Sequence, residues 1–235
     1  MNVRAAMFDD VLRNAWHLVV TFDPNVFEYA VRSLIIATIS TLVAGVIGIP
    51  IGILIGEHDF VGKRAVVTIL NTLLALPTVV VGLTVYMFLS RQGPWGHLEL
   101  LFTVPGIIIG EVLLIVPLIT ALTVAAISRT GRDVRKTALA LGASPGQAYW
   151  TVICESRFGV LAAIVAAFGR VVSEVGVATI LGGNIDRFTR TMTTAIVRYV
   201  DMGEFALALA LGILLLAISL SINIVFQYFQ GGGRE

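Results

Sequence analysis

The sequence predicts an all-α integral membrane protein with about five transmembrane helices and one polar hairpin. Of its 235 residues, 57% are hydrophobic and 13% are charged, and the mean hydropathy is +0.93. Soluble domains carry about 25% charged residues. Five stretches are mainly apolar over about 20 residues, the length that a helix needs to cross a bilayer. A polar island with a helix–turn–helix pattern separates the third stretch from the fourth.

The expected organisation is an interfacial segment at 1–29, a single transmembrane domain at 30–229 and a short tail at 230–235. In the first segment, "FDDVLRNAWHLVV" (8–20) is too short and too charged to span a membrane. It is predicted to lie as an amphipathic helix in contact with lipid, with Trp16 at headgroup depth. The spans are expected at 30–55, 65–89, 105–127, 160–181 and 205–229.

Lysine and arginine set the expected orientation, because they are enriched in cytoplasmic loops. The loop after the third span is the most basic, so we place it in the cytoplasm. The N-terminus is then outside and the C-terminus inside. Cys154, the only cysteine, faces a reducing compartment and excludes an internal disulfide. The basic residues of the loop are Arg129, Arg132, Arg135, Lys136 and Arg157.

Small residues recur at every fourth position of the first span: Ala44, Gly48, Gly52 and Gly56. Such a stripe lets two helix backbones approach closely. We favour tight helix packing over a direct role in handling a substrate. Prolines are expected to kink the first three spans, since each removes one backbone hydrogen bond; they are Pro50, Pro77 and Pro117.

The polar island reads as two short helices joined by a tight turn, across 129–157. Gly142 suits the position just past a helix end, where φ is positive. Ser144 suits an N-cap, Pro145 the first helical position, and Gln147 stands at capping-box spacing. A plain amphipathic connection is one interpretation. A cytoplasmic handle for a partner outside the membrane is the other.

The island "ALALGASPGQAYWTV" (138–152) resembles the coupling loop of permease subunits of ABC importers. In that family's pattern, Ala138 stands for the last residue of Glu-Ala-Ala, and Gly142 and Val152 stand for its glycine and isoleucine. Cys154 and Glu155 replace its Leu-Pro. The resemblance implies that this loop docks into a cleft of an ATPase subunit. Its matching residues are Ala138, Gly142, Ala143, Ser144, Pro145 and Val152.

Other segments resemble the molybdate, sulfate and tungstate branch: "LPTVVVGL" (76–83), "VPGIIIG" (104–110) and "GRVVSEVG" (169–176). "GGNIDRFTRTMTTAI" (182–196) is most similar to tungstate permeases. The resemblance implies a type I importer in a bacterial or archaeal cytoplasmic membrane. It has two copies of this chain, two ATPase subunits that hold ATP and Mg²⁺, and an extracytoplasmic binding protein. The implied cargo is tungstate, with molybdate or sulfate as the alternative.

The charged residues Arg170 and Glu174 are candidates for the translocation path. Arg170 and Glu174 stand four apart in the fourth span, so they share a helix face. Each charge at the bilayer centre costs about 2.5–3.5 kcal/mol, so such residues normally pair or face water. The pair is either structural or an attractor for the anion, together with Ser173 and Gly176. Glu111, in the third span, is expected to be paired, protonated or turned away from the path.

The segment at 182–196 carries neutral donors and positive charge that suit an oxyanion. It is either an outer gate or a docking surface for the binding protein. Its candidate residues are Gly182, Gly183, Asn184, Thr189, Arg190, Thr193 and Thr194.

Other functions lack their residue patterns. "GEHDFVGKR" (56–64) lacks the spacing of a phosphate-binding loop, so the ATPase is expected to be a separate chain and this chain no enzyme. His17, His58 and His97 lack metal-ligand spacing, and no basic run suggests nucleic acid. An ion-coupled secondary transporter, the alternative of another class, would favour inverted repeats that five spans do not provide. A membrane enzyme ranks third, because no catalytic constellation is present.

Overall fold

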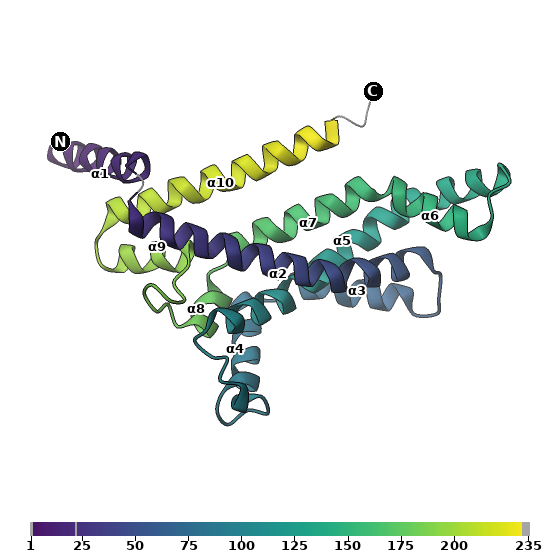
Figure 1. Cartoon of the computed structure of the whole chain (residues 1–235), viewed down its shortest axis with the longest axis horizontal. Coiled ribbons are helices and arrows are strands. Elements are labelled where there is room, and N and C mark those ends of the chain that lie inside the picture. Colours follow the sequence, from purple (N-terminus) through teal and green to yellow (C-terminus); the bar gives the residue numbers. More distant parts are fainter. Residues whose placement is uncertain (1, 22, 232–235) are drawn as a thin grey trace.

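The computed structural model describes residues 2–21 and 23–231, which form an elongated helical bundle (Figure 1). No strand occurs within these ranges, which confirms the all-α prediction. Residues 232–235 of the expected tail lie outside the described part. The long helices α2 (Pro24–Glu57), α5 (Val104–Ala140), α7 (Arg157–Val172) and α10 (Phe205–Gly231) run along the bundle.

The glycine stripe forms the seam between α2 and α5. A Cβ at Gly52 would lie 2.6 Å from Thr123 Cβ, and one at Gly56 would lie 2.8 Å from Ile127 Cβ. Gly48 faces Ile119 in the same way, at 3.2 Å. At Gly52 and Gly56 only glycine permits this approach, because real Cβ atoms do not come so close. The prediction of tight helix packing is confirmed.

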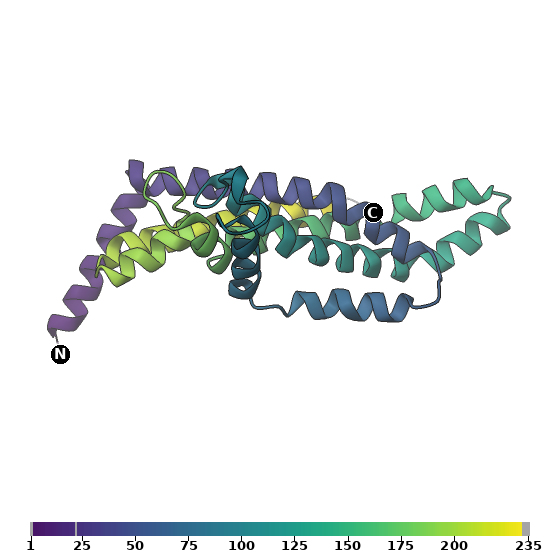
Figure 2. The ribbon, with the colours of Figure 1, turned by 90° about the horizontal axis from the view of Figure 1, so that it is seen from below.

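In the described part of the chain, three helices are long and apolar enough to cross a membrane: α2, α5 and α10. The number reaches five if two bent pairs each count as one span. The expected span at 65–89 is bent at the expected proline, but far more sharply than a kink within one helix. It consists of α3 (Lys63–Leu74) and α4 (Thr78–Leu89), which meet at 96°. Figure 2 shows α4 crossing the long axis while α3 runs along it. Pro77 explains the break, because proline lacks an N–H and disfavours helix at the preceding residue.

The fourth span, expected as one helix at 160–181, is likewise interrupted. Helix α7 ends at Val172, and the short helix α8 (Gly176–Gly182) begins after a break. The Glu174 carboxylate accepts hydrogen bonds from the N–H groups of Gly176 and Val177, at 2.8 and 3.4 Å. A carboxylate at this place satisfies the free donors of a helix start. Glu174 therefore stands beyond α7, not in the middle of a span.

The main hydrophobic core includes residues of both terminal helices. It combines α1 (Asn2–Val20), α2, α5, α7, α9 (Met192–Asp201) and α10 through residues such as Ala15, Ile119 and Leu211. Ala15 is buried while its neighbour Trp16 is 62% exposed, so α1 packs through one face.

The helix η1 (Gly96–Leu98) follows α4. The hairpin formed by α5 and α6 (Pro145–Glu155) and the segment around 184–191 lie at opposite ends of the bundle (Figure 1).

Candidate functional site

The hairpin begins where α5 ends, in a turn that closes on itself. Gly142 has φ of +89°, as predicted. The N–H of Ala143 donates to the Ala138 carbonyl and the N–H of Gly142 to the Leu139 carbonyl, both at 3.0 Å. These two bonds are the Schellman pattern, which satisfies carbonyls that the helix end leaves free. Ala138 and Gly142 are thus tied together by backbone chemistry.

Helix α6 (Pro145–Glu155) starts with the predicted capping box. The Ser144 hydroxyl accepts from the Gln147 N–H at 3.4 Å, and the Ser144 N–H donates to the Gln147 side chain at 2.8 Å. Pro145 occupies the first helical position. Two reciprocal bonds fix the direction in which the chain enters α6. The turn Gly142–Ala143–Ser144–Pro145 is therefore a rigid corner.

One face of α6 packs back onto α5 and the other remains open. Ala148 and Val152 are fully buried. Gly131 of α5 makes room for Val152, whose Cγ1 would lie 3.3 Å from a Cβ at that position. On the outer side Leu141 is 83% exposed and Trp150 is 65% exposed. The hairpin thus presents apolar side chains on a rigid support.

Arg170 and Glu174 form the expected ion pair, with 3.0 Å between Nη1 and Oε2. The Glu174 side chain is 2% exposed, whereas that of Arg170 is 42% exposed. Ser173 turns its hydroxyl to the Gly169 carbonyl at 2.8 Å. At Gly176 a Cβ would meet the Thr78 hydroxyl at 2.6 Å, so α4 and α8 approach closely there. The four candidate path residues are brought together by the break between α7 and α8.

Glu111 is buried near this break, with 1% of its surface exposed. Its Oε2 has no hydrogen-bond partner in the described part of the chain. A cavity of about 10 Å³ beside it is also lined by Ser33, Glu174, Thr191 and Thr193. The carboxyl group is thus turned into the fold.

The segment that joins α8 to α9 is held by a polar network. Tyr29 donates its hydroxyl to Asp186 at 2.6 Å, and Arg190 pairs with Asp186 at 3.1 Å. The Arg190 Nε also donates to the Asn184 side chain at 3.0 Å. The hydrogen bond from Tyr29 lowers the pKa of Asp186, and the Arg190 and Arg187 charges lower it further. The positive charge of Arg190 is therefore neutralised within the segment.

Most neutral donors of this segment are also used inside the fold. Thr193 donates to the Glu174 carbonyl at 2.6 Å, and Thr189 donates to the Gly182 carbonyl. Thr194 and Thr191 form the capping box of α9. The Gly183 N–H donates to the Thr179 carbonyl at 2.9 Å. The structure thus uses most of these donors within the fold, because buried donors must find partners. Ile185 and Phe188 are exposed instead, at 44% and 53%.

Sequence reasoning missed the anchors of this network on α2. Tyr29 binds Asp186, and Arg32 donates to the carbonyls of Arg187 and Arg190 at 2.9 and 3.1 Å. Arg32 also pairs with Glu28 at 2.6 Å. A cluster of polar residues at the start of an otherwise apolar span was the available signal, since such residues need partners.

Comparison with known proteins supplies the family. The model of the family described as binding-protein-dependent transport system inner membrane component matches residues 48–232. The chain belongs to this family. The match includes the whole hairpin, the α7–α8 break and the segment that follows it. As a member of this family of membrane components, the chain is a multi-pass permease subunit.

Three similar proteins match most of the chain. A tungstate uptake system permease protein of Peptoclostridium acidaminophilum is 38% identical, over 93% of this chain and 96% of the relative. A tungstate uptake system permease protein of Campylobacter jejuni is 37% identical, over 92% and 90%. A probable anion ABC transporter permease protein of Haloferax volcanii is 37% identical, over 84% and 88%.

Proposed function

We propose that this permease forms the translocation path of an ATP-driven importer for tungstate. The observation that carries the proposal is the rigid hairpin with an apolar outer face, in a chain whose similar relatives include two tungstate permeases. ATP and Mg²⁺ are bound by a separate ATPase subunit in this proposal. This chain supplies the path and the contact surface.

The hairpin is the proposed contact with the ATPase. Leu141 and Trp150 offer exposed apolar surface, and exposed aromatic residues are typical of interface centres. Two ATPase subunits need two hairpins, so the membrane part is a dimer of this chain in the proposal. A twofold pair is also the commonest closed assembly.

Movement of the hairpin would reach the membrane through α5. Helix α5 continues from the membrane into the hairpin without a break, and Val152 fixes α6 against it. The glycine seam then joins α5 to α2 at close distance. Closely packed helices move as units rather than deform. Closure of the ATPase pair opens the path outward in this proposal, and hydrolysis resets it.

The binding protein is proposed to dock at the opposite end of the bundle, outside the cell. Support comes from the segment at 184–191, which lies far from the hairpin and exposes Ile185 and Phe188. We favour docking over an outer gate, because most hydrogen-bond donors of the segment at 182–196 are used within the fold. The N-terminus would lie on this side and the hairpin in the cytoplasm.

The test is reconstitution of the chain with its ATPase in lipid vesicles. We expect tungstate uptake that requires ATP, and hydrolysis that rises when binding protein and tungstate are both added. Competition with molybdate and sulfate then ranks the three oxyanions. Uptake that follows an ion gradient without the ATPase would instead identify a secondary transporter. A complex with one copy of this chain beside a different permease would contradict the dimer.

A further inference from the structure

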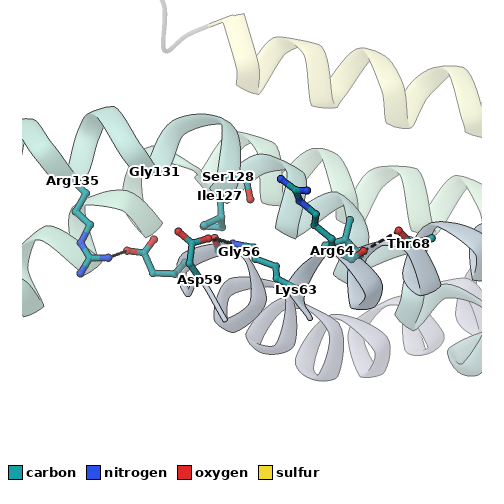
Figure 3. Close-up of a pocket in the computed structure, with 11 residues that line it drawn as sticks. Gly56, Asp59, Lys63, Arg64, Thr68, Ile127, Ser128, Gly131 and Arg135 are labelled. Carbon is teal, nitrogen blue, oxygen red and sulfur yellow. Dashed lines mark hydrogen bonds and ion pairs between the residues drawn. The ribbon is translucent and has the colours of Figure 1, made fainter. Parts of the chain in front are cut away.

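A pocket of about 660 Å³ opens between the end of α2, the start of α3 and α5 (Figure 3). Its volume lies within the range of about 300–1,000 Å³ that is typical of small-ligand pockets. The pocket is lined by most of the stretch 56–64, which lacks the spacing of a phosphate-binding loop. The lining residues that carry charge are Glu57, Asp59, Lys63, Arg64 and Arg135.

Among the described lining residues, one of the three cations has no carboxylate partner. Arg135 pairs with Glu57 at 3.1 Å, and Lys63 pairs with Asp59 at 3.2 Å. Within the described ranges, the guanidinium of Arg64 has neither an ion pair nor a hydrogen bond. Figure 3 shows its side chain reaching from α3 towards the α5 side of the pocket, where Ser128 lies. Among the described lining residues, two carboxylates and three cations leave one positive charge, and it belongs to Arg64.

Helix α3 extends a polar face from the pocket along the bundle. Arg64, Thr68 and Asn71 follow one another at helical spacing, and all three are exposed. No residue of α3 is buried. Polar residues on a helix of a membrane protein normally face protein or a water-filled space rather than lipid. The pocket is therefore placed at one end of a hydrophilic strip.

The wall of the pocket is part of the hairpin support. A Cβ at Gly131 would lie 3.3 Å from Val152 of α6 and 3.6 Å from the Glu57 carboxylate. The Arg135–Glu57 pair joins the same stretch of α5 to the end of α2. Any displacement of the hairpin relative to α2 must change the shape of this pocket.

We infer that this pocket is an oxyanion site, in which Arg64 holds the transported anion as it leaves on the hairpin side. A guanidinium suits a tetrahedral oxyanion because it offers two parallel donors. A single free cation also binds weakly enough to let the anion go, which conduction requires. The inference rests on the proposed tungstate transport.

The first experiment measures occupancy. The whole transporter, with its ATPase, is placed in phosphatidylcholine nanodiscs and carries Thr68→Cys in a Cys154→Ser background. We expect millimolar tungstate to slow the reaction of this cysteine with N-ethylmaleimide, and Arg64→Gln to abolish the protection. Protection that persists in Arg64→Gln, or its absence in both proteins, would overturn the site. The same reaction is also measured in phosphatidylglycerol nanodiscs. If these discs slow the reaction of the cysteine and tungstate has no effect, the pocket binds a lipid headgroup and the inference is overturned.

The second experiment measures transport in vesicles. Arg64→Gln should lower tungstate uptake by about ten- to a hundredfold, the factor expected for one lost hydrogen bond to a charged group. Within the described ranges the Arg64 guanidinium has no partner, and the Arg64 carbonyl that accepts from Thr68 remains in the variant, so the complex should assemble normally. Arg91→Gln removes an equal charge from an exposed position outside the pocket and should leave uptake unchanged. Wild-type protein without tungstate uptake would refute the proposed function. Normal uptake by both variants would refute only the exit site.

Discussion

Glu174 binds Arg170 with one carboxylate oxygen and the start of α8 with the other. The first contact is 3.0 Å long, and the second, to the Gly176 N–H, is 2.8 Å long. Glu174 is buried while Arg170 is half exposed. The carboxylate thus serves two elements, whereas the guanidinium serves one.

This asymmetry predicts unequal effects of the two alanine substitutions. Glu174→Ala should lower the thermal unfolding midpoint in detergent more than Arg170→Ala, because it also frees two backbone donors of α8, each worth about 1–3 kcal/mol if buried without a partner. Arg170→Ala leaves the carboxylate with those donors. If the pair is structural, the double variant should regain part of the loss. If the two single effects on the unfolding midpoint simply add in the double variant, the ion pair does not stabilise the fold. A folded but inactive double variant would favour anion attraction by Arg170.

The turn of the hairpin provides a matched pair of glycines. A Cβ at Gly142 or at Gly146 would meet nothing within 4 Å, but only Gly142 has positive φ. Gly142→Val should therefore strain the backbone, by about 1–2 kcal/mol, and weaken ATPase assembly or uncouple hydrolysis from transport. Gly146→Ala should be tolerated, since alanine favours helix. Unchanged transport by Gly142→Val would show that the turn does not couple the subunits.

The α2–α5 seam predicts a steric effect. Gly52→Ala places a methyl group 2.6 Å from Thr123 Cβ and 2.9 Å from the Thr120 carbonyl. Overpacking of this kind costs about 1–3 kcal/mol, so the unfolding midpoint should fall. Gly45→Ala on the same helix is the control, because its nearest neighbour is 3.8 Å away. Equal midpoints for the two variants would contradict the close approach.

The Tyr29–Asp186 bond predicts a pH dependence. Because the pKa of Asp186 is lowered in the folded chain, its contribution to stability is present above the ordinary aspartate pKa of about 3.9 and is lost as pH falls through the folded value. The difference in unfolding midpoint between wild type and Asp186→Asn should be constant from neutral pH down to mild acid. It should then shrink below about pH 4. A difference that changes near neutral pH would contradict this assignment.

The exposed side chains at the far end predict a docking phenotype. Phe188→Ser should weaken association with the binding protein while leaving basal ATPase activity and assembly unchanged, since Phe188 is 53% exposed. Thr193→Val should instead lower stability, because the buried hydroxyl donates to the Glu174 carbonyl. Normal association of the Phe188 variant, together with a stable Thr193 variant that has lost transport, would restore the outer-gate interpretation.

The sequence by itself determined the features that depend on neighbours along the chain. Gly142, Ser144, Pro145 and Gln147 specify the hairpin through backbone φ and capping, which act over four or five residues. The glycine stripe likewise predicted close helix packing from its spacing alone. Apolar length located α2, α5 and α10, the helices long enough to cross a membrane, and it indicated the stretches at 65–89 and 160–181, which the structure bends or breaks.

Tertiary structure decided which polar groups remain free. Arg190 and Thr193 suit an oxyanion by residue type, but Asp186 and the Glu174 carbonyl occupy them. Arg64 carries the same charge as Lys63 and Arg135, yet only those two find carboxylates. A pairing between helices depends on distances in space, and a buried polar group takes whichever partner folding brings to it. Residue type alone therefore does not distinguish a structural cation from one that is free to bind a ligand.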